Sequence, residues 1–453
     1  MTEHMHPDAI RTLFSQAMSD MYRTEVPQYG TLIDLVREVN ADTLVADPAL
    51  SAQLRAAGEL DRLDVERHGA IRLGSAQELQ AIRRMFAVMG MFPVGYYDLS
   101  VAGIPVHSTA FRPVDETSLK RNPFRVFTSL LRLDLIKDRT LVAEAEEILN
   151  QRQIVTDGAF ALMDRAEANG GLTEAEAEEF VREALETFRW HSDATVSAET
   201  YEKLVAAHRL VADVVSFRGP HINHLTPRTL DIDAVQRAMP ERGIDPKAVI
   251  EGPPRRAADI LLRQTSFKAL QEEVIFHGIP GTHLARFGEI EQRGVALTPK
   301  GRALYDLALA EVRAGKSGSY TERLEAGFAA LPDNHDTMRR DALAFYRYRA
   351  TGTAPASKAD SLDALIDSGA LVADPQVYED FLPVSAAGIF QSNLGSDDQS
   401  SYRPAANKDA FETALGAQVS DEIALYAATE AKSLVIALET LGQSHLLADH
   451  KAA

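Results

Sequence analysis

The sequence predicts an α+β protein, because segments of strand character alternate with longer segments of helical spacing. Val, Ile, Tyr and Phe, with Gly and Pro between them, concentrate in two blocks, near residues 64–135 and 211–300. Both blocks have the composition of short strands joined by turns. Helical periodicity prevails between the blocks and after the second one. The length is enough for two or three ordinary cores or for one large elaborated domain, and we expect the single large domain, residues 1–453.

The first 60 residues predict helices. Apolar residues recur at helical spacing over residues 7–39, with a break between Pro27 and Gly30. A further helix is expected over residues 48–60, because Asp47 is a suitable N-cap and proline suits the first helical position.

The first strand-rich block covers residues 61–140 and opens with DVERHGAIRLG at 64–74. Its short length and internal glycine favour an extended segment. In such a segment His68 and Arg72 lie on the same face, with their backbones roughly 13 Å apart. Strands are also expected over residues 92–111, where Val, Tyr, Ile and Phe alternate with Gly and Pro.

A helix is expected between these strands, beginning at Ser75 and reaching Met89. Glu78 stands three residues after the serine, which is the pattern of a capping box. A helical insert is predicted next, over residues 141–210, with a helix cap at Thr173. A second strand-rich block follows at 211–300, with strands near 211–217 and 260–298. Residues 301–380 are predicted as a helical segment with a loop at 350–358, and residues 381–453 as a small apolar loop and a C-terminal helix from about Lys408.

Composition excludes several kinds of site. The chain has no cysteine, so thiolate catalysis and cysteine-held metals are excluded. A metal must be held by histidines and carboxylates, which favours iron, manganese or a catalytic zinc. The net charge of -19 argues against a nucleic-acid partner, which needs a basic surface. An anionic substrate must therefore be attracted by local arginines.

The N-terminal sequence lacks the positively charged start and apolar core of a signal peptide. No apolar run reaches the length of a transmembrane helix. We therefore expect a cytoplasmic protein without a membrane partner.

Two histidines lie in the segment GPHINHLTPRTLDID at residues 219–233. Pro220 and Pro227 prevent a long helix here, because proline removes a backbone donor and disfavours helical geometry before it. A short extended segment is expected instead. It would carry His221 and His224 close to chain turns, where functional sites are often built.

A carboxylate could come from ARFGEIEQRG at residues 285–294, where strand geometry puts Glu289 and Glu291 on one face. Two histidines from separate strands and one carboxylate form the set that holds non-heme Fe(II) with coordination positions left open. The candidate ligands are His68, His224 and either Glu289 or Glu291, and the spacing also leaves His107, His191 and His221 as alternatives.

Arg72 is the candidate for substrate binding. It shares a face with His68, and in an acidic protein an arginine beside a metal site suggests bidentate binding of a substrate carboxylate. A structural salt bridge is the alternative.

Five long motifs run from near the N-terminus almost to the C-terminus. They are ERHGAIRLG at 66–74, GMFPVGYYDLS at 90–100, GPHINHLTPRTLDID at 219–233, RFGEIEQRGVALTPKGRALYD at 286–306 and FLPVSAAGIFQSNLG at 381–395. These motifs resemble the 2-oxoadipate dioxygenase/decarboxylase family, also called hydroxyglutarate synthase. The resemblance implies a fold related to the vicinal-oxygen-chelate superfamily, with curved β-sheet modules in a half-barrel core around one metal and many surrounding helices.

The resemblance also implies a set of site residues. Fe(II) would be held by His68, His224 and Glu289. The motif E-x-x-Q-R at 289–293 resembles the final-strand ligand motif of 4-hydroxyphenylpyruvate dioxygenases, so Glu289 is preferred over Glu291. Arg72 resembles the arginine that binds the substrate carboxylate, and Val384 with Ser385 resembles the substrate-pocket loop.

The implied reaction converts 2-oxoadipate and O2 to D-2-hydroxyglutarate and CO2, late in lysine catabolism. Oxidative decarboxylation would precede hydroxylation of the same molecule. The alternative is a metal-dependent isomerase or lyase of the same superfamily, in which the metal acts as a Lewis acid. A non-enzymatic binding protein is a further alternative, and replacement of His224 would leave its function intact.

Overall fold

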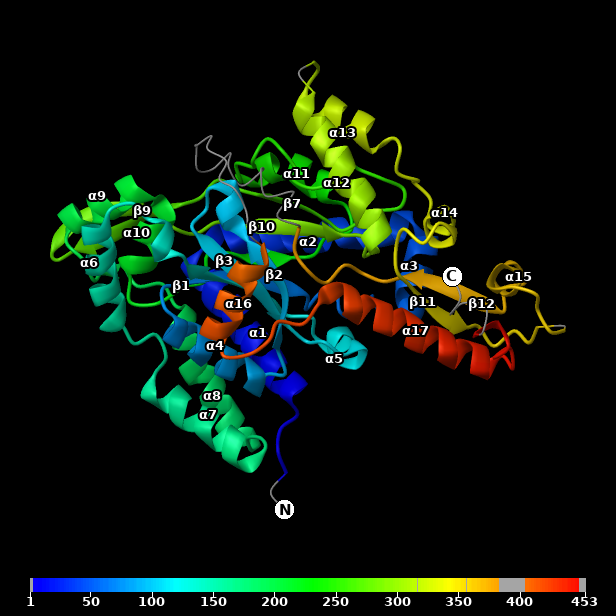
Figure 1. Cartoon of the computed structure of the whole chain (residues 1–453), viewed down its shortest axis with the longest axis horizontal. Coiled ribbons are helices and arrows are strands. Elements are labelled where there is room, and N and C mark those ends of the chain that lie inside the picture. The colour runs from blue at the N-terminus through cyan, green and yellow to red at the C-terminus, as the bar shows by residue number, and fades with distance from the viewer. Residues whose placement is uncertain (1–2, 316, 356, 383–403, 448–453) are drawn as a thin grey trace. The chain divides into compact units, whose positions relative to one another are not determined.

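The computed structural model describes residues 3–315, 317–355, 357–382 and 404–447. These residues form helices and several small sheets, so the predicted α+β class is confirmed (Figure 1). The chain divides into two compact units: the first contains residues 1–251, 263–292 and 381–420, and the second contains residues 252–262, 293–380 and 421–453. The prediction of a single large domain stays a prediction.

Three N-terminal helices open the first unit: α1 (Pro7–Glu25), α2 (Pro27–Ala46) and α3 (Pro48–Ala57). Each begins with proline at its first position, where the missing N–H costs no hydrogen bond. The Asp47 side chain accepts a hydrogen bond from the Leu50 N–H, as a helix cap does. The predicted cap is therefore confirmed.

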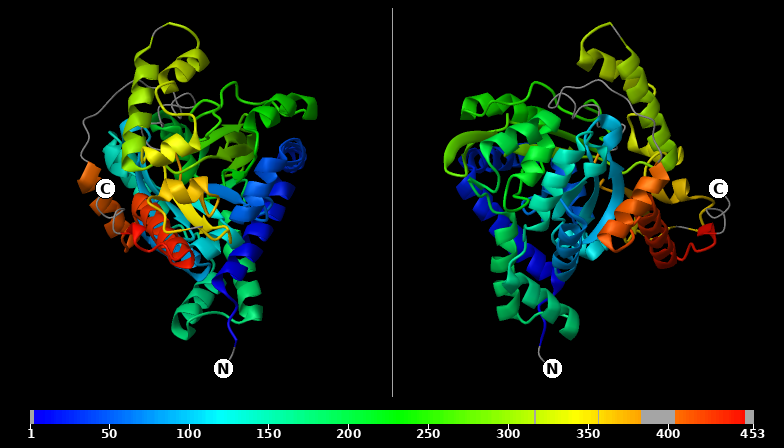
Figure 2. Two further views of the ribbon diagram at one scale, coloured as in Figure 1. Left: turned by 90° about the vertical axis from the view of Figure 1, so that its right-hand side faces the viewer. Right: turned by 60° about the vertical axis from the view of Figure 1, so that its left-hand side comes forward.

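A five-stranded sheet forms the centre of the first unit (Figure 2). Its spatial order is β2-β3-β4-β1-β6, and β1 is parallel to β4 but antiparallel to β6. The helix α4 follows β1 in the chain and packs against β2. The strands are β1 (Arg67–Leu73), β2 (Phe92–Asp98), β3 (Val106–Arg112), β4 (Arg125–Leu131) and β6 (Leu225–Pro227).

The capping interaction before α4 (Ala76–Val88) differs in part from its prediction. The Ser75 side chain accepts the Glu78 N–H, as expected. The Glu78 carboxylate, however, accepts the N–H of Gly74 at 2.8 Å and also pairs with Arg152. The carboxylate thus binds the end of β1 to the helical insert.

Helices surround this sheet, and short strands complete the unit. The remaining helices are α5 (Glu116–Arg121), α6 (Arg139–Asn150), α7 (Asp157–Asn169), α8 (Glu174–Leu185), α9 (Ala198–Ala207), α10 (Arg209–Val215), α11 (Ile232–Ala238) and α16 (Pro404–Leu415). The remaining strands are β5 (Asp193–Ala194), β7 (Leu262–Ser266), β8 (Gln271–Phe276), β9 (Ile279–Leu284) and β10 (Glu289–Arg293).

The strand predicted near residues 211–217 is wrong, because residues 209–215 form the helix α10. His208 caps this helix by accepting the Leu210 N–H. The valines at 211, 214 and 215 are all buried. Burial on more than one side of a short helix gives the same valine-rich composition as a strand, so propensity was misleading here.

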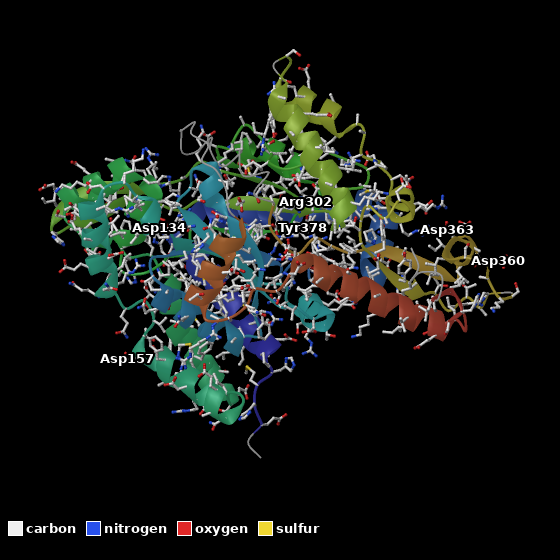
Figure 3. The ribbon with its side chains drawn as sticks, viewed as in Figure 1. Asp134, Asp157, Arg302, Asp360, Asp363 and Tyr378 are labelled. Atoms are coloured by element: carbon white, nitrogen blue, oxygen red, sulfur yellow. The ribbon has the colours of Figure 1, made fainter. Side chains whose placement is uncertain are left out.

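The second unit contains a two-stranded sheet that the sequence did not predict, within the segment 301–380. Strands β11 (Tyr346–Ala350) and β12 (Leu371–Pro375) pair antiparallel. Its helices are α12 (Pro299–Ala314), α13 (Tyr320–Phe328), α14 (His335–Arg340), α15 (Leu362–Asp367) and α17 (Glu422–Thr440). Arg302 of α12 lies beside Tyr378, and its charge acts on the hydroxyl (Figure 3).

The predicted C-terminal helix is two helices, α16 and α17. Gly416 follows α16 with a φ of 67°, a backbone conformation that glycine adopts without strain. Among the described residues, no helix combines the length and the apolar character that crossing a bilayer requires.

Tyr22 of α1 connects the N-terminal helices to the segments that carry the predicted ligands. Its hydroxyl is buried and lies 2.9 Å from the carbonyl oxygen of Asn223 and 2.8 Å from that of Phe287. These residues precede His224 and Glu289 by one and two positions. One hydroxyl thus helps to fix both segments.

Replacing Tyr22 with phenylalanine should lower the free energy of unfolding by about 1–3 kcal/mol, because buried carbonyl groups lose a hydrogen-bond donor. Urea denaturation measures this change. Tyr29→Phe is the matched control, because the Tyr29 hydroxyl has only a 3.4 Å contact with Ser19 and should contribute less. Equal losses in the two variants would contradict the role given to Tyr22.

Candidate metal centre

The predicted ligands come from three segments that lie side by side. His68 is the second residue of β1 and stands opposite Thr226 of β6. His224 directly precedes β6. Glu289 is the first residue of β10, which continues the pairing through a bridge between Glu291 and Arg228. Strand pairing therefore brings together residues separated by more than 200 positions.

Gly69 allows the close approach of the segment that carries His224. A Cβ atom at this position would lie 2.5 Å from Cδ1 of Ile222 and 3.3 Å from the carbonyl oxygen of His224. The internal glycine of β1 thus has a packing reason, since a larger residue would push this segment away from His68.

His68, His224 and Glu289 form a compact buried group. One ligand atom from each lies within 4.8 Å of the other two, and all three residues are buried. Nε2 of His68 is 3.1 Å from Oε2 of Glu289, and Nδ1 of His224 is 3.4 Å from the same oxygen. Two imidazoles and one carboxylate suit Fe(II) and other first-row divalent metals, so these residues fit the expected ion.

Thr226 is part of this group although the sequence gave no sign of it. Its hydroxyl donates to Oε2 of Glu289 at 3.0 Å and lies 3.0 Å from Nδ1 of His224. The threonine therefore orients two of the three proposed ligands, as outer partners of metal sites do. Only the pairing of β6 with β1 reveals it.

Glu291, the alternative ligand, lies on the other side of the His68 ring. Its Oε2 is 2.8 Å from Nδ1 of His68, whereas Glu289 faces Nε2. A carboxylate at Nδ1 fixes the tautomer and leaves Nε2 for a metal. The geometry thus favours Glu289 as the ligand and Glu291 as its support.

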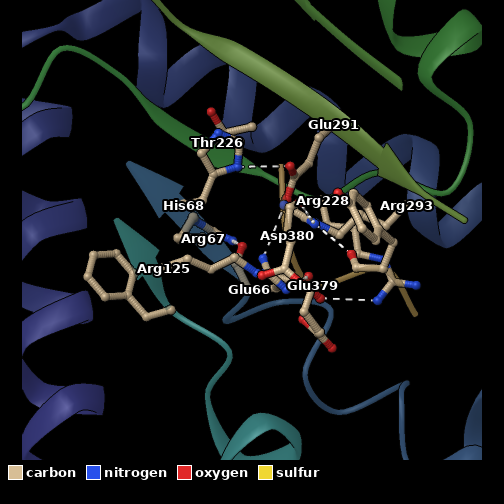
Figure 4. Close-up of polar contacts among 12 residues, drawn as sticks. Glu66, Arg67, His68, Arg125, Thr226, Arg228, Glu291, Arg293, Glu379 and Asp380 are labelled. Carbon is tan, nitrogen blue, oxygen red and sulfur yellow. Dashed lines mark hydrogen bonds and ion pairs between the residues drawn. The ribbon is translucent and has the colours of Figure 1, made fainter. Parts of the chain in front are cut away.

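Arginines compensate the buried carboxylates behind His68 (Figure 4). Nη1 of Arg125 lies 3.6 Å from Glu291, and Nη2 lies 2.8 Å from Glu66. Glu66 also pairs with Arg62 and Arg228, each at 3.1 Å. The Glu66, Arg125 and Glu291 side chains are fully buried. Each of these charges is therefore compensated by its ion-pair partners and not by water.

The surroundings set the protonation of His68, His224 and Glu289, the three proposed ligands. Burial lowers the pKa of His224 to about 4. Burial also lowers the pKa of His68, but the charges and hydrogen bonds of Glu291 and Glu289 outweigh it and hold that pKa above the ordinary value. The pKa of Glu289 lies below its ordinary value: burial raises it, but His224, His68 and Thr226 together prevail. The carboxylate is therefore ready to bind a cation at neutral pH.

Aromatic rings cover both histidines. Phe381 meets the His68 ring edge to face at 4.9 Å, and Phe287 stacks on His224 at the same centroid distance. Phe127 packs in turn against Phe381 at 4.8 Å. These rings limit the access of water to the site.

The other histidines left open by the sequence are not brought into this group. His107 on β3 contacts Tyr96 and Phe411. His191 is half-buried. His221 lies 3.5 Å from Asp213 and contacts Trp190 edge to face.

Arg72 forms a salt bridge with Asp213, with 2.6 Å between Nη1 and Oδ2. The arginine side chain is 28% exposed. Burial is the main cause of the low pKa of His224, and the charges of His68 and Arg72 lower that pKa further, against Glu289, which raises it. The sequence missed Asp213 because it was assigned to a strand. Val384 and Ser385, the predicted pocket loop, lie outside the described residues.

A model of the 2-oxoadipate dioxygenase/decarboxylase family matches residues 14–393. A curated protein of that name from Pseudomonas putida is 57% identical over 455 residues, covering 97% of this chain and 98% of the relative. One from Escherichia coli is 58% identical over 440 residues, covering 96% and 98%.

Solved structures agree with these matches. The crystal structure of the hydroxyglutarate synthase from Pseudomonas putida has a TM-score of 0.90 at 54% identity, covering 98% of this chain and 100% of that chain. A structure of the Pseudomonas putida synthase in complex with 2-oxoadipate has a TM-score of 0.91 at 55% identity, with the same coverage.

Exchanging each glutamate for glutamine should separate their roles. Glu291→Gln should weaken metal binding about 10- to 100-fold, as the loss of an outer carboxylate does. Glu289→Gln should weaken it more, because a ligand charge is lost. Competition with a chelator of known affinity measures both constants. A greater loss in Glu291→Gln would make Glu291 the ligand.

The number of protons released on metal binding should show whether His68 is protonated in the metal-free protein. A metal displaces the proton from a ligand nitrogen, so affinity falls as pH decreases. Because the pKa of His68 is above 6.5 and that of His224 is about 4, binding at pH 6.5 should release between about one half and one proton. Calorimetry in buffers of different ionisation enthalpy measures this number. Release of two protons would contradict these assignments.

Proposed function

Because the chain belongs to the 2-oxoadipate dioxygenase/decarboxylase family, we propose that it converts 2-oxoadipate and O2 to D-2-hydroxyglutarate and CO2 with one Fe(II). The observation that carries this proposal is the buried group of His68, His224 and Glu289, with its ligand atoms within 4.8 Å. Two histidines and one carboxylate leave several coordination positions open for substrate and O2.

In this proposal the iron supplies the activation of O2 and a chelating position for the 2-oxo acid. His68, His224 and Glu289 hold the ion. Thr226 and Glu291 keep the ligands in place through the contacts described above. The rings of Phe381 and Phe287 shield the reacting atoms from water.

In this proposal Arg72 determines the specificity of the protein for a substrate with a second carboxylate. Four positions along β1 from His68, it lies on the same face of the strand, so its backbone is roughly 13 Å away. An arginine binds a carboxylate through two parallel hydrogen bonds. We propose that it binds the distal carboxylate while the 2-oxo acid end lies at the metal. Val384 and Ser385 are proposed to line the same pocket.

The proposed reaction balances without a second organic substrate. The bond between the first and second carbons of 2-oxoadipate breaks, and the first carbon leaves as CO2. The second carbon takes one oxygen atom of O2 and becomes a carboxylate, while the third carbon takes the other as a hydroxyl. The product is 2-hydroxyglutarate, the D isomer by resemblance to the family. We propose a role late in lysine catabolism, and the cytoplasmic location stays a prediction.

The proposal is tested by adding 2-oxoadipate to the protein after anaerobic reconstitution with Fe(II). Equal amounts of O2 consumed, CO2 released and 2-hydroxyglutarate formed are expected. His224→Ala should abolish all three, because it removes a ligand. Turnover without O2 consumption would instead favour a Lewis-acid isomerase or lyase.

Arg72→Ala should raise the KM for 2-oxoadipate about 10-fold or more while iron remains bound, because a charge-assisted carboxylate contact is lost. Steady-state kinetics and iron content measure the two effects. Arg67→Ala is a matched control on the same strand. The Arg67 guanidinium donates to the backbone carbonyl of Glu66 at 2.7 Å, and strand alternation puts Arg67 on the face of β1 opposite to Arg72. An unchanged KM in Arg72→Ala would refute the assignment of Arg72.

A further inference from the structure

We propose that Asp213 is a positioning residue that fixes the guanidinium of Arg72 for the distal carboxylate of the substrate. This inference rests on the function proposed above, in which Arg72 binds that carboxylate. It concerns a residue of α10, 141 positions away from Arg72 in the chain. Asp213 would not touch the substrate but would act through the arginine.

Asp213 has a separate partner for each of its oxygens. Oδ2 accepts from Nη1 of Arg72 at 2.6 Å. Oδ1 lies 2.9 Å from Nε2 of His283, and Nε2 of His221 is 3.5 Å from it. The contact with Arg72 therefore leaves the other half of the carboxylate held by histidine, which keeps the carboxylate in one orientation.

The burial of His283 agrees with its role as a partner that holds the Asp213 carboxylate. It is the buried residue of β9, a strand whose other residues are exposed or half-buried. Its neighbour Leu284 is 50% exposed, so burial of the histidine follows its contacts and not its hydrophobicity. Nδ1 of His283 lies 2.9 Å from the Tyr201 hydroxyl. A chain of contacts thus runs from Tyr201 through His283 and Asp213 to Arg72.

Aromatic side chains hold this chain of contacts in place. Phe217 packs against His283 at 4.8 Å, and Trp190 meets His221 edge to face at 4.7 Å. The strand β9 and the helices α9 and α10 gather at one side of the first unit (Figure 1). Several rigid elements therefore fix Asp213, and a fixed partner reduces the freedom that Arg72 would lose on binding.

The charge of Asp213 is maintained despite burial. Burial raises the pKa of its carboxyl, but the Arg72 charge and the contacts of His221 and His283 hold that pKa well below the ordinary value. The ion pair is therefore present throughout the neutral range. The arginine meets a substrate with its guanidinium already oriented.

Arg72 retains the capacity to bind a second carboxylate. Among the described residues its hydrogen bond is with Asp213 through Nη1, while a guanidinium has five N–H donors in a planar fork. Its side chain is 28% exposed, compared with 8% for Asp213. Nη1 is held by Asp213, and in this proposal the remaining N–H donors bind the substrate carboxylate.

The test compares two ligands that differ at one end only. 2-Oxoadipate has the distal carboxylate, and 2-oxohexanoate has a methyl group there. Calorimetry under anaerobic conditions gives their dissociation constants with the Fe(II)-loaded protein. Asp213→Asn should weaken 2-oxoadipate binding about tenfold, whereas binding of 2-oxohexanoate should change less than about twofold.

A double-mutant cycle identifies the route of the effect. Arg72→Ala should show the same selective loss, and adding Asp213→Asn to it should cause no further loss for 2-oxoadipate, because the two residues act as one unit. Asp374→Asn is the matched control: this buried aspartate also pairs with an arginine, Arg349 at 3.1 Å, and should leave both constants unchanged.

Three outcomes would overturn the inference. An equal loss for both ligands in Asp213→Asn would show a merely structural role, and additive losses in the cycle would separate Asp213 from Arg72. If Arg72→Ala itself treats both ligands alike, the proposed role of Arg72 fails, and the role of Asp213 fails with it. Should Asp213→Asn not fold, Tyr201→Phe removes the outer end of the chain and should give a smaller loss with the same selectivity.

Discussion

The ion pairs around His68 are the constraint on which the rest of the site depends. Two glutamates flank one imidazole in the interior, and Glu291 lies behind it without contact with solvent. An uncompensated charge in that position would cost several kcal/mol. The buried Arg125, and beyond it Glu66 with two further arginines, provide the compensation. These residues come from β4, β10, the segment before β1 and the chain after β6, so the network connects these parts of the first unit.

One strand then joins the two halves of the proposed chemistry. One end of β1 carries His68, a proposed metal ligand, and the other end carries Arg72 on the same face. The separation of the two is set by strand geometry and not by a flexible loop. A rigid spacing of this kind suits a substrate with a functional group at each end. Asp213 would add to it by removing the remaining freedom of the arginine.

The sequence predicted what local pattern determines. Alternation in β1 placed His68 and Arg72 on one face, and Asp47 marked a helix start correctly. Strand spacing left Glu289 and Glu291 open, because both point to the same side of β10, and only the family resemblance favoured Glu289. The structure places the His68 ring between the two glutamates. Thr226 and Asp213 were missed for a related reason. Their roles arise from long-range pairing, and the valine-rich sequence around Asp213 suggested a strand, whereas these residues form the short helix α10.

The fate of isotopically labelled O2 tests most directly whether the protein carries out oxidative decarboxylation followed by hydroxylation of the same molecule. The Fe(II)-loaded protein is given 2-oxoadipate under labelled O2, and the product is examined by mass spectrometry. We expect both labelled atoms in one molecule of 2-hydroxyglutarate, one in the new carboxylate and one in the hydroxyl, with no label in CO2. A product without label, or with label in only one of these positions after exchange with water is controlled, would contradict this chemistry.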